Sequence, residues 1–358
     1  MKRLLFALFL LSGALLAAGP KAKNVILFLT DGGGLATVSA ASIHGYGRPQ
    51  ALYIQNMLHI GLSDTSSASN WVTDSANGMT AIVTGVKTHN GVISQGPDAV
   101  RGVKDGTPLK TILEYAEERG LSTGVMTDVE IGDATPAVCY AHHNDRGKMG
   151  EIFLQLTKPR FGDGPEIVIG RGRDGLARGT QALGVDLWAA LRKAGYTLLE
   201  TPDAIKSADT AAPKLAGVFK DKFDVTEAVD LAINRLSRNR KGFFLMVECD
   251  VHLGDARKSV EAMVAADRLV RHTAEKMKGT DTLIISTSDH SYDLRLPGGV
   301  KKGEDIIPHM KLEGHHDGEE VVVAAQGPGS ELVHGFLPNT RIFEIMMAAY
   351  GWKADARR

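Results

Sequence analysis

The sequence predicts an α/β protein built as a three-layer sandwich, in which a mostly parallel central sheet carries helices on both faces. Short apolar runs rich in β-branched and aromatic residues, such as NVILFLT at 24–30, are typical of buried strands. Segments with helical periodicity lie between these runs, and this alternation indicates parallel strands joined by helical crossovers. No repeat or low-complexity linker breaks the pattern.

The first expected element along the chain is a secretory signal peptide at residues 1–18. The start is positively charged, residues 4–16 are almost entirely apolar, and small residues follow as a cleavage site. The apolar run is short for a membrane span of about 20 residues, and an uncleaved anchor is the alternative. We therefore expect an exported protein, periplasmic or secreted, with no membrane association after cleavage. Residues 19–358 are expected to form a single domain.

After the signal peptide, strands and helices are expected to alternate. Strands are predicted at 24–30, 122–127, 166–170, 243–248, 282–287 and 321–326. Helices are predicted from Ser75 to about residue 84 and at 109–119, 183–194, 225–238, 260–277 and 341–350. In 225–238, for example, apolar residues recur every three or four positions, among them Ala228, Leu231 and Ala232.

Charge and cysteine content exclude some classes of protein. The net charge of -1 argues against nucleic acid or anionic lipid as the main partner. Cys139 and Cys249 cannot build a disulfide framework, and the sequence does not decide whether a single bridge joins them. We expect both thiols to be reduced or buried.

Polar side chains follow several of the predicted strands. In parallel α/β sheets, ligands gather at the carboxyl ends of the strands, so these residues are the candidates for a site. They are Asp31, Asp133, Thr135, Glu248, Asp289 and His290. Asp133 and Thr135 lie two residues apart, so in an extended segment both side chains would point to one side.

Ser75 lies where an extended segment gives way to a predicted helix. A plain N-cap is one interpretation, since serine is favoured at that position. The other is a nucleophile, because a helix start offers free N–H groups and a positive dipole end that stabilise an alkoxide or a phosphoryl group. Imidazole with carboxylate, as in Asp289-His290 and at His316, suits Zn²⁺, whereas an oxygen-only set such as Asp133, Thr135 and Glu248 suits Mg²⁺.

Seven segments occur in the order found in a known family. They are TDSANGMTAIVTGVKTHNG at 73–91, DATPAVCYAHHNDR at 133–146, GFFLMVE at 242–248, SDH at 288–290, HDG at 316–318, GPG at 327–329 and NT at 339–340. In this respect the chain resembles the alkaline phosphatases, from about residue 24 to residue 349. Any one segment is weak on its own, but their ordered recurrence is specific.

The resemblance implies a role for each matching residue. Ser75 would be the nucleophile that becomes phosphoserine, and Arg146 would hold two oxygens of the substrate's phosphate in a fork. It also implies one zinc site of Asp31, Asp289 and His290, a magnesium site of Asp31, Asp133, Thr135 and Glu248, and a second zinc site that includes His316. Zn²⁺ (one or two ions) and Mg²⁺ are then the cofactors, and small phosphomonoesters the substrates.

The chain departs from the family pattern at the second zinc site. The family places an Asp and a His five and nine residues after the magnesium glutamate, where this chain has Leu253 and Arg257. Neither of these side chains ligates zinc. Asp250 and His252 would take over if the loop is shorter by three residues. The alternative is that the second zinc site is lost, in which case phosphoserine would turn over slowly.

The main functional prediction is a metal-dependent phosphomonoester hydrolase that acts through phosphoserine at Ser75. A phosphodiesterase on the same scaffold is one alternative, and a phosphate- or metal-binding relative with little turnover is another. Sulfatase chemistry is disfavoured, because Pro and then Arg do not follow at the positions that related sulfatases require. The sequence leaves a homodimer open.

Overall fold

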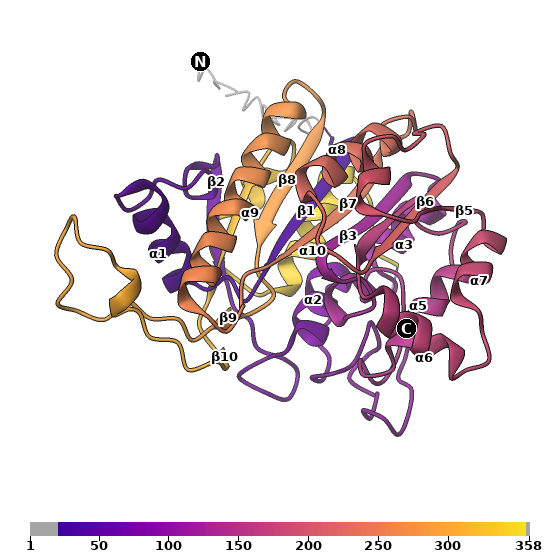
Figure 1. Cartoon of the computed structure of the whole chain (residues 1–358), viewed down its shortest axis with the longest axis horizontal. Coiled ribbons are helices and arrows are strands. Elements are labelled where there is room, and N and C mark those ends of the chain that lie inside the picture. Colours follow the sequence, from indigo (N-terminus) through magenta and orange to yellow (C-terminus); the bar gives the residue numbers. More distant parts are fainter. Residues whose placement is uncertain (1–20, 356–358) are drawn as a thin grey trace, which may run out of the picture.

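The computed structural model of the chain describes residues 21–355, and within this range a ten-stranded sheet forms the middle layer of the molecule (Figure 1). The predicted signal peptide at 1–18 lies outside the described residues. No helix within 21–355 is both long enough and apolar enough to cross a bilayer.

The sheet is almost entirely parallel, as predicted. Across it, the strands follow the order β12 (Gly335–Leu337), β2 (His59–Ser63), β11 (Val321–Gln326), β8 (Thr282–Thr287), β1 (Asn24–Asp31), β7 (Phe243–Asp250), β3 (Ser122–Glu130), β4 (Ile167–Arg171), β6 (Lys214–Phe219) and β5 (Tyr196–Leu199). Only β11 runs antiparallel to its neighbours. The central strand β1 is buried along its whole length, which explains its continuous apolar sequence.

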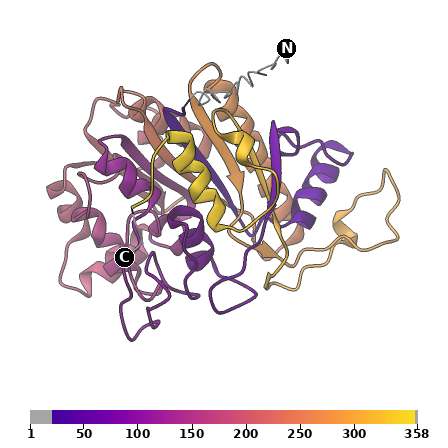
Figure 2. The same cartoon turned by 180° about the vertical axis from the view of Figure 1, so that it is seen from behind.

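Helices cover both faces of the sheet, so the predicted three-layer sandwich is confirmed. Side chains of β1 alternate between two cores, with Val25 and Leu27 in one and Ile26 and Phe28 in the other. The face toward the viewer in Figure 1 carries α1 (Leu35–Tyr46), α8 (Val225–Leu236) and α9 (Ala256–Lys276). The other face, with α10 in yellow in Figure 2, carries α2 (Ser75–Thr84), α3 (Ile112–Glu118), α4 (Ala134–Ala137), α5 (Met149–Leu154), α6 (Arg173–Gln181), α7 (Leu187–Lys193) and α10 (Thr340–Tyr350).

All six predicted strands and six predicted helices are present, with shifts at their ends. Helix α9 begins four residues before the predicted start because Asp255 caps it, accepting a hydrogen bond from Lys258 N–H. Helix α3 begins later than predicted because Thr111 and Glu114 form a capping box.

A long arm leaves the body of the protein next to the sheet. It runs between two short antiparallel strands, β9 (Ser291–Tyr292) and β10 (His316–Asp317), and appears as the gold excursion in Figure 1. Leu294 and Ile306 of the arm are buried and belong to the same core cluster as residues of α9 and α1.

Candidate active site

The carboxyl ends of three adjacent strands bring predicted site residues to one edge of the sheet. Asp31 is the last residue of β1 and pairs with Asp250, the last residue of β7, while Glu248 lies two positions earlier on β7. Asp289 and His290 follow shortly after the end of β8. Residues far apart in the sequence therefore converge at this edge, as predicted.

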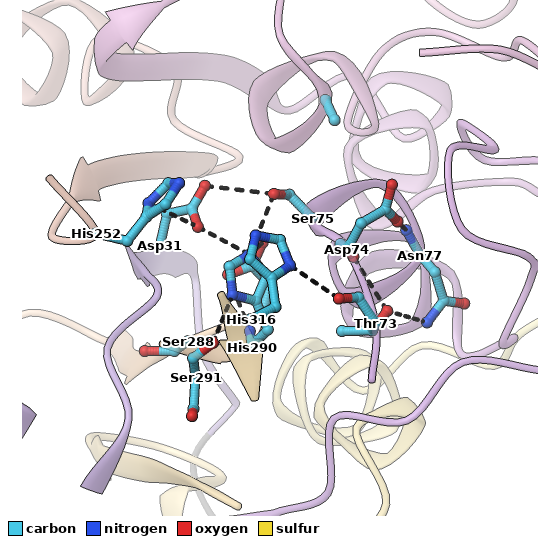
Figure 3. Close-up of polar contacts among 12 residues, drawn as sticks. Asp31, Thr73, Asp74, Ser75, Asn77, His252, Ser288, His290, Ser291 and His316 are labelled. Carbon is cyan, nitrogen blue, oxygen red and sulfur yellow. Dashed lines mark hydrogen bonds and ion pairs between the residues drawn. The ribbon is translucent and has the colours of Figure 1, made fainter. Parts of the chain in front are cut away.

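Ser75 is the first residue of α2 and faces this edge (Figure 3). Its Oγ lies 3.4 Å from Asp31 Oδ2 and 3.3 Å from His290 Nε2. The interpretation of Ser75 as a plain N-cap is wrong, because Asp74 is the cap and its side chain accepts a hydrogen bond from Asn77 N–H. The serine hydroxyl is therefore free of the capping role and lies in the first turn, where the helix dipole favours negative charge.

Two glycines make this close packing feasible. A Cβ on Gly78 of α2 would lie 2.6 Å from the carbonyl oxygen of Asp289. Gly32 has a positive φ of 77°, and a Cβ there would lie 2.5 Å from the Cβ of His252. A side chain at either position would push site segments apart, so glycine is needed for the close approach.

Asp31, Asp289 and His290 form a cluster that suits a metal ion. Each offers one ligand atom, and these atoms lie within 4.8 Å of one another. Burial raises the pKa of Asp289 to about 7, and repulsion from Asp31 adds to this shift. Burial alone would lower the pKa of His290, but Asp289 and Asp31 raise it to about 9. Carboxylate and imidazole are ligands that Zn²⁺ accepts.

Buried carboxylate oxygens at the same edge lack hydrogen-bond donors. Among residues 21–355, Asp289 Oδ2 and Glu248 Oε2 are buried and have no such donor. Burial raises the pKa of Glu248 well above its usual value, and the negative charge of Asp31 raises it further. Burying several carboxylates together is costly unless a cation compensates them. The residues present therefore fit metal ions.

Arg146 is held beside the nucleophile by two carboxylates. Its Nη1 lies 3.2 Å from Asp74 Oδ2, and its Nη2 lies 2.9 Å from Asp133 Oδ1. Burial would lower the pKa of this guanidinium, but Asp133 and Asp74 raise it above the usual range. Arg146 is therefore a fixed positive charge next to the residue that precedes Ser75.

The expectation of an extended segment at 133–135 is wrong. These residues begin the helical turn α4, with Asp133 as N-cap and its Oδ1 2.7 Å from Ala134 N. Pro136 suits a first helical turn, where no N–H is needed. Thr135 is buried within α4, so its side chain and that of Asp133 do not share one face of a strand.

Asp250 and His252 lie against the first cluster. His252 Nδ1 is 2.6 Å from Asp250 Oδ1 and 3.4 Å from Asp31 Oδ1. Burial would lower the pKa of His252, but Asp250 and Asp31 raise it to about 9. The His252 ring centroid lies 5.8 Å from that of His290 and 6.0 Å from that of His316. The ring of His252 therefore lies beside the rings of His290 and His316.

His316 stacks on His290, with ring centroids 3.7 Å apart (Figure 3). Its Nδ1 lies 2.9 Å from the carbonyl oxygen of Thr73. A carbonyl only accepts, so Nδ1 carries the proton and Nε2 stays available as a ligand atom. Burial and the neighbouring His290 lower the pKa of His316, which favours the neutral ring that a metal requires.

Sequence reasoning missed two supporting residues, Asp74 and Asp128. Asp74 caps α2 and holds Arg146, and its position next to Ser75 was the available signal. Asp128 Oδ1 accepts a hydrogen bond from Asp250 N–H at 2.9 Å, just beyond the last β3–β7 pair, Thr127 with Glu248. Asp128 directly follows the predicted strand at 122–127, so the strand-exit rule would have found it. The cysteines Cys139 and Cys249 are free and buried, as expected.

The chain is similar to known phosphatases. A family model described as alkaline phosphatase matches residues 22–313. The tissue-nonspecific alkaline phosphatase of Homo sapiens is 27% identical, over 90% of this chain and 74% of the relative. Streptomycin-6-phosphate phosphatase of Streptomyces griseus is also 27% identical, over 93% of this chain and 92% of the relative. The solved alkaline phosphatase of the Antarctic bacterium TAB5 has a TM-score of 0.76 at 27% identity and covers 94% of this chain and 100% of its own.

Proposed function

The chain belongs to the alkaline phosphatase family and is a phosphomonoesterase, and we propose that it works through a metal-dependent reaction with a phosphoserine intermediate on Ser75. The observation that carries this proposal is the placement of Ser75. Its hydroxyl lies within 3.4 Å of both Asp31 and His290, at the start of a ten-residue helix.

In the proposed reaction, Ser75 Oγ forms a bond to phosphorus as the bond to the leaving oxygen breaks. The serine loses its proton in this step, and the leaving oxygen gains a proton and departs as the alcohol. Arg146 would donate hydrogen bonds to two phosphate oxygens, and Asp74 and Asp133 orient its guanidinium for this. Water then cleaves the phosphoserine, which restores the serine hydroxyl and releases phosphate.

Asp31, Asp289 and His290 would hold zinc, and Asp31, Asp133, Thr135 and Glu248 would hold magnesium. When bound, zinc lowers the pKa of a hydroxyl and offsets charge on the phosphoryl oxygens. The buried oxygens of Asp289 and Glu248 that lack donors support this assignment. Asp31 would serve both sites from the end of β1.

We further propose that Asp250, His252 and His316 hold a second zinc and that this site supports phosphoserine hydrolysis. The contact of His252 Nδ1 with Asp250 Oδ1 at 2.6 Å and the proton on His316 Nδ1 support the assignment. A phosphatase with Asp250 and His252 as ligands would both form and hydrolyse phosphoserine, although Leu253 and Arg257 occupy the family's ligand positions.

Activity and metal content test these proposals on the purified chain. Ser75→Ala is expected to lower turnover of 4-nitrophenyl phosphate at least a thousandfold, while Ser237→Ala at the end of α8 leaves it unchanged. Metal analysis should find two zinc ions per chain, and one in Asp250→Ala/His252→Ala. One zinc in the parent chain would contradict the second site, and full activity in Ser75→Ala would contradict the nucleophile.

Leu253 and Arg257, which stand where the family has an Asp and a His, favour a second candidate function: a phosphate-binding relative with little turnover. Labelled phosphoserine that accumulates to one per chain and does not decay would support that candidate against the hydrolase. Comparing a nitrophenyl monoester with its diester separates the proposed activity from a phosphodiesterase, for which the diester would be the better substrate. We also propose that the protein is exported, with residues 19–358 as one catalytic domain.

A further inference from the structure

Trp71 stands out among the apolar side chains of residues 21–355. At 88% exposure it is the most exposed large hydrophobic residue there, and it lies four positions before Ser75. The other two tryptophans are packed: Trp188 lies under the Arg173 guanidinium at 4.2 Å, and Trp352 stacks on Tyr350. Trp71 is therefore the one tryptophan in this range whose ring is exposed to solvent and not packed against another side chain.

The backbone that carries Trp71 is nevertheless fixed on both sides. Before it, Ser67 N–H donates to Asn70 O at 2.9 Å, and Asn70 N–H donates to Ser67 Oγ at 2.8 Å. After it, Asn90 Nδ2 donates to Val72 O at 3.2 Å. The next carbonyl, that of Thr73, accepts the hydrogen bond from the His316 ring described above. A rigid backbone with an uncovered ring is a preorganised contact surface.

Trp71 lies beside a segment that contributes to the site. A Cβ on Gly318 would lie 3.5 Å from Trp71 O, so Trp71 is against the segment that follows His316. Four residues span at most about 14 Å, which limits the distance between the Cα atoms of Trp71 and Ser75. Ser75 itself is only 4% exposed, so the alcohol part of an ester whose phosphorus faces Ser75 has to extend outward toward solvent.

We propose that Trp71 is a specificity-determining residue that stacks on a planar leaving group, such as the base of a nucleoside monophosphate. This inference rests on the proposed reaction at Ser75. Indole rings stack on flat π-systems with little dependence on their substituents, because each such group presents a similar face. An aliphatic leaving group offers no face to stack on, so it gains nothing from Trp71.

Two substrates that differ only by the base test the proposal: adenosine 5′-monophosphate and ribose 5-phosphate. Trp71→Ala is expected to lower kcat/KM for the nucleotide about tenfold, mainly through KM, and to leave ribose 5-phosphate within about twofold. Trp71→Phe should restore most of the loss. Phe336→Ala, which removes a side chain 75% exposed at the far edge of the sheet, is the matched control and should change neither substrate. An equal loss for both substrates, or no loss, overturns the inference.

Binding without turnover separates this inference from the reaction itself. In Ser75→Ala, adenosine 5′-monophosphate should quench tryptophan fluorescence and ribose 5-phosphate should not, and Ser75→Ala/Trp71→Phe should show no quenching. If the parent chain hydrolyses neither ester, the proposed reaction fails while the quenching still reports the stacking. Absence of quenching, or quenching that persists without Trp71, overturns the role of Trp71.

Discussion

Asp128 supports the site through its side chain, which accepts a hydrogen bond from Asp250 N–H. Asp128→Ala would leave this partly buried N–H without an acceptor, which costs about 1–3 kcal/mol of unfolding free energy. Because Asp250 contacts His252, we also expect weaker binding of the second zinc. Zinc titration monitored by metal analysis, with denaturant unfolding in parallel, measures both effects.

The matched control for this prediction is Asp128→Asn, which keeps a carbonyl oxygen for the same N–H. It should retain zinc binding near the parent level. If Asp128→Ala loses stability but binds the second zinc normally, Asp128 supports only the strand end and not the ligands.

Glu117 makes stability depend on pH. Burial raises its pKa from 4.5 to about 7, although Thr123 donates a hydrogen bond to it. The folded state therefore holds the proton more tightly than the unfolded state, so this contribution to stability is complete below pH 4.5 and is lost as pH rises through about 7. Relative to the parent, Glu117→Gln should gain about 3 kcal/mol between pH 4.5 and pH 8. Urea unfolding at several pH values measures this gain, and a constant difference would contradict the assignment.

At the scale of elements, Ser94 joins the nucleophile helix to the segment after α4. It is fully buried with a positive φ of 42°, donates from Oγ to Val138 O at 2.7 Å, and donates from N to Thr80 Oγ1 on α2 at 3.1 Å. Ser94→Ala loses the hydroxyl contact and keeps the strain, so it should cost about 1–3 kcal/mol. Ser94→Gly relieves the left-handed strain and should cost about 1 kcal/mol less. Denaturant unfolding compares the two, and equal losses would show that the strain carries no energy.

The sequence predicts six of the ten strands in the central sheet and misses β2, β5, β6 and β12. The predicted strand at 321–326 matches β11, although β11 is the strand that runs antiparallel, since alternation of elements carries no information about direction. The missed strands β12 and β5 lie at the two edges of the sheet, and β2 lies next to β12 and is partly exposed. The missed strand β6 is fully buried, but its run KLAGVF begins with a lysine and is interrupted by Gly217. Helix α1 was missed because Gly34, with no side chain, stands at its cap position.

At the scale of the whole molecule, the C-terminal tail is attached beside α3. Trp352 stacks on Tyr350 with centroids 3.9 Å apart, Arg119 lies 4.8 Å over the Trp352 ring, and Lys110 pairs with Asp355 at 3.1 Å. Removing residues 352–358 should lower the unfolding free energy by about 2 kcal/mol. Thermal unfolding and kcat/KM measure the result, and removal of 356–358 alone is the control.

This truncation should leave kcat/KM unchanged, because the tail begins near the amino end of β1 and Asp31 lies at the other end. Gly351 is close to Lys21, and Ala22 N–H donates to Ala349 O. A loss of activity with no loss of stability would contradict this separation.

The convergence of the site was predictable from strand exits, because adjacent parallel strands end at one edge whatever their order in the chain. Asp250 and His252 were predicted only as substitutes under a shortened loop, because strand exits alone do not show which residues of a loop face inward. What directs His252 is a contact between distant segments, its Cβ against Gly32, and periodicity within one segment cannot reveal such a contact. The same holds for α4, where Asp133 capping overrides the extended pattern.

The arm between β9 and β10 leaves and returns through one short ladder, in which His316 pairs with Tyr292 and Asp317 with Ser291. His290 stands just before this ladder and His316 within it. The spacing of the two imidazoles is thus set by backbone pairing and ring stacking, and the length of the chain between them does not enter. The outer part of the arm can therefore be lengthened, shortened or exchanged, in evolution or by engineering. Such changes would alter the surroundings of the site while both imidazoles keep their positions.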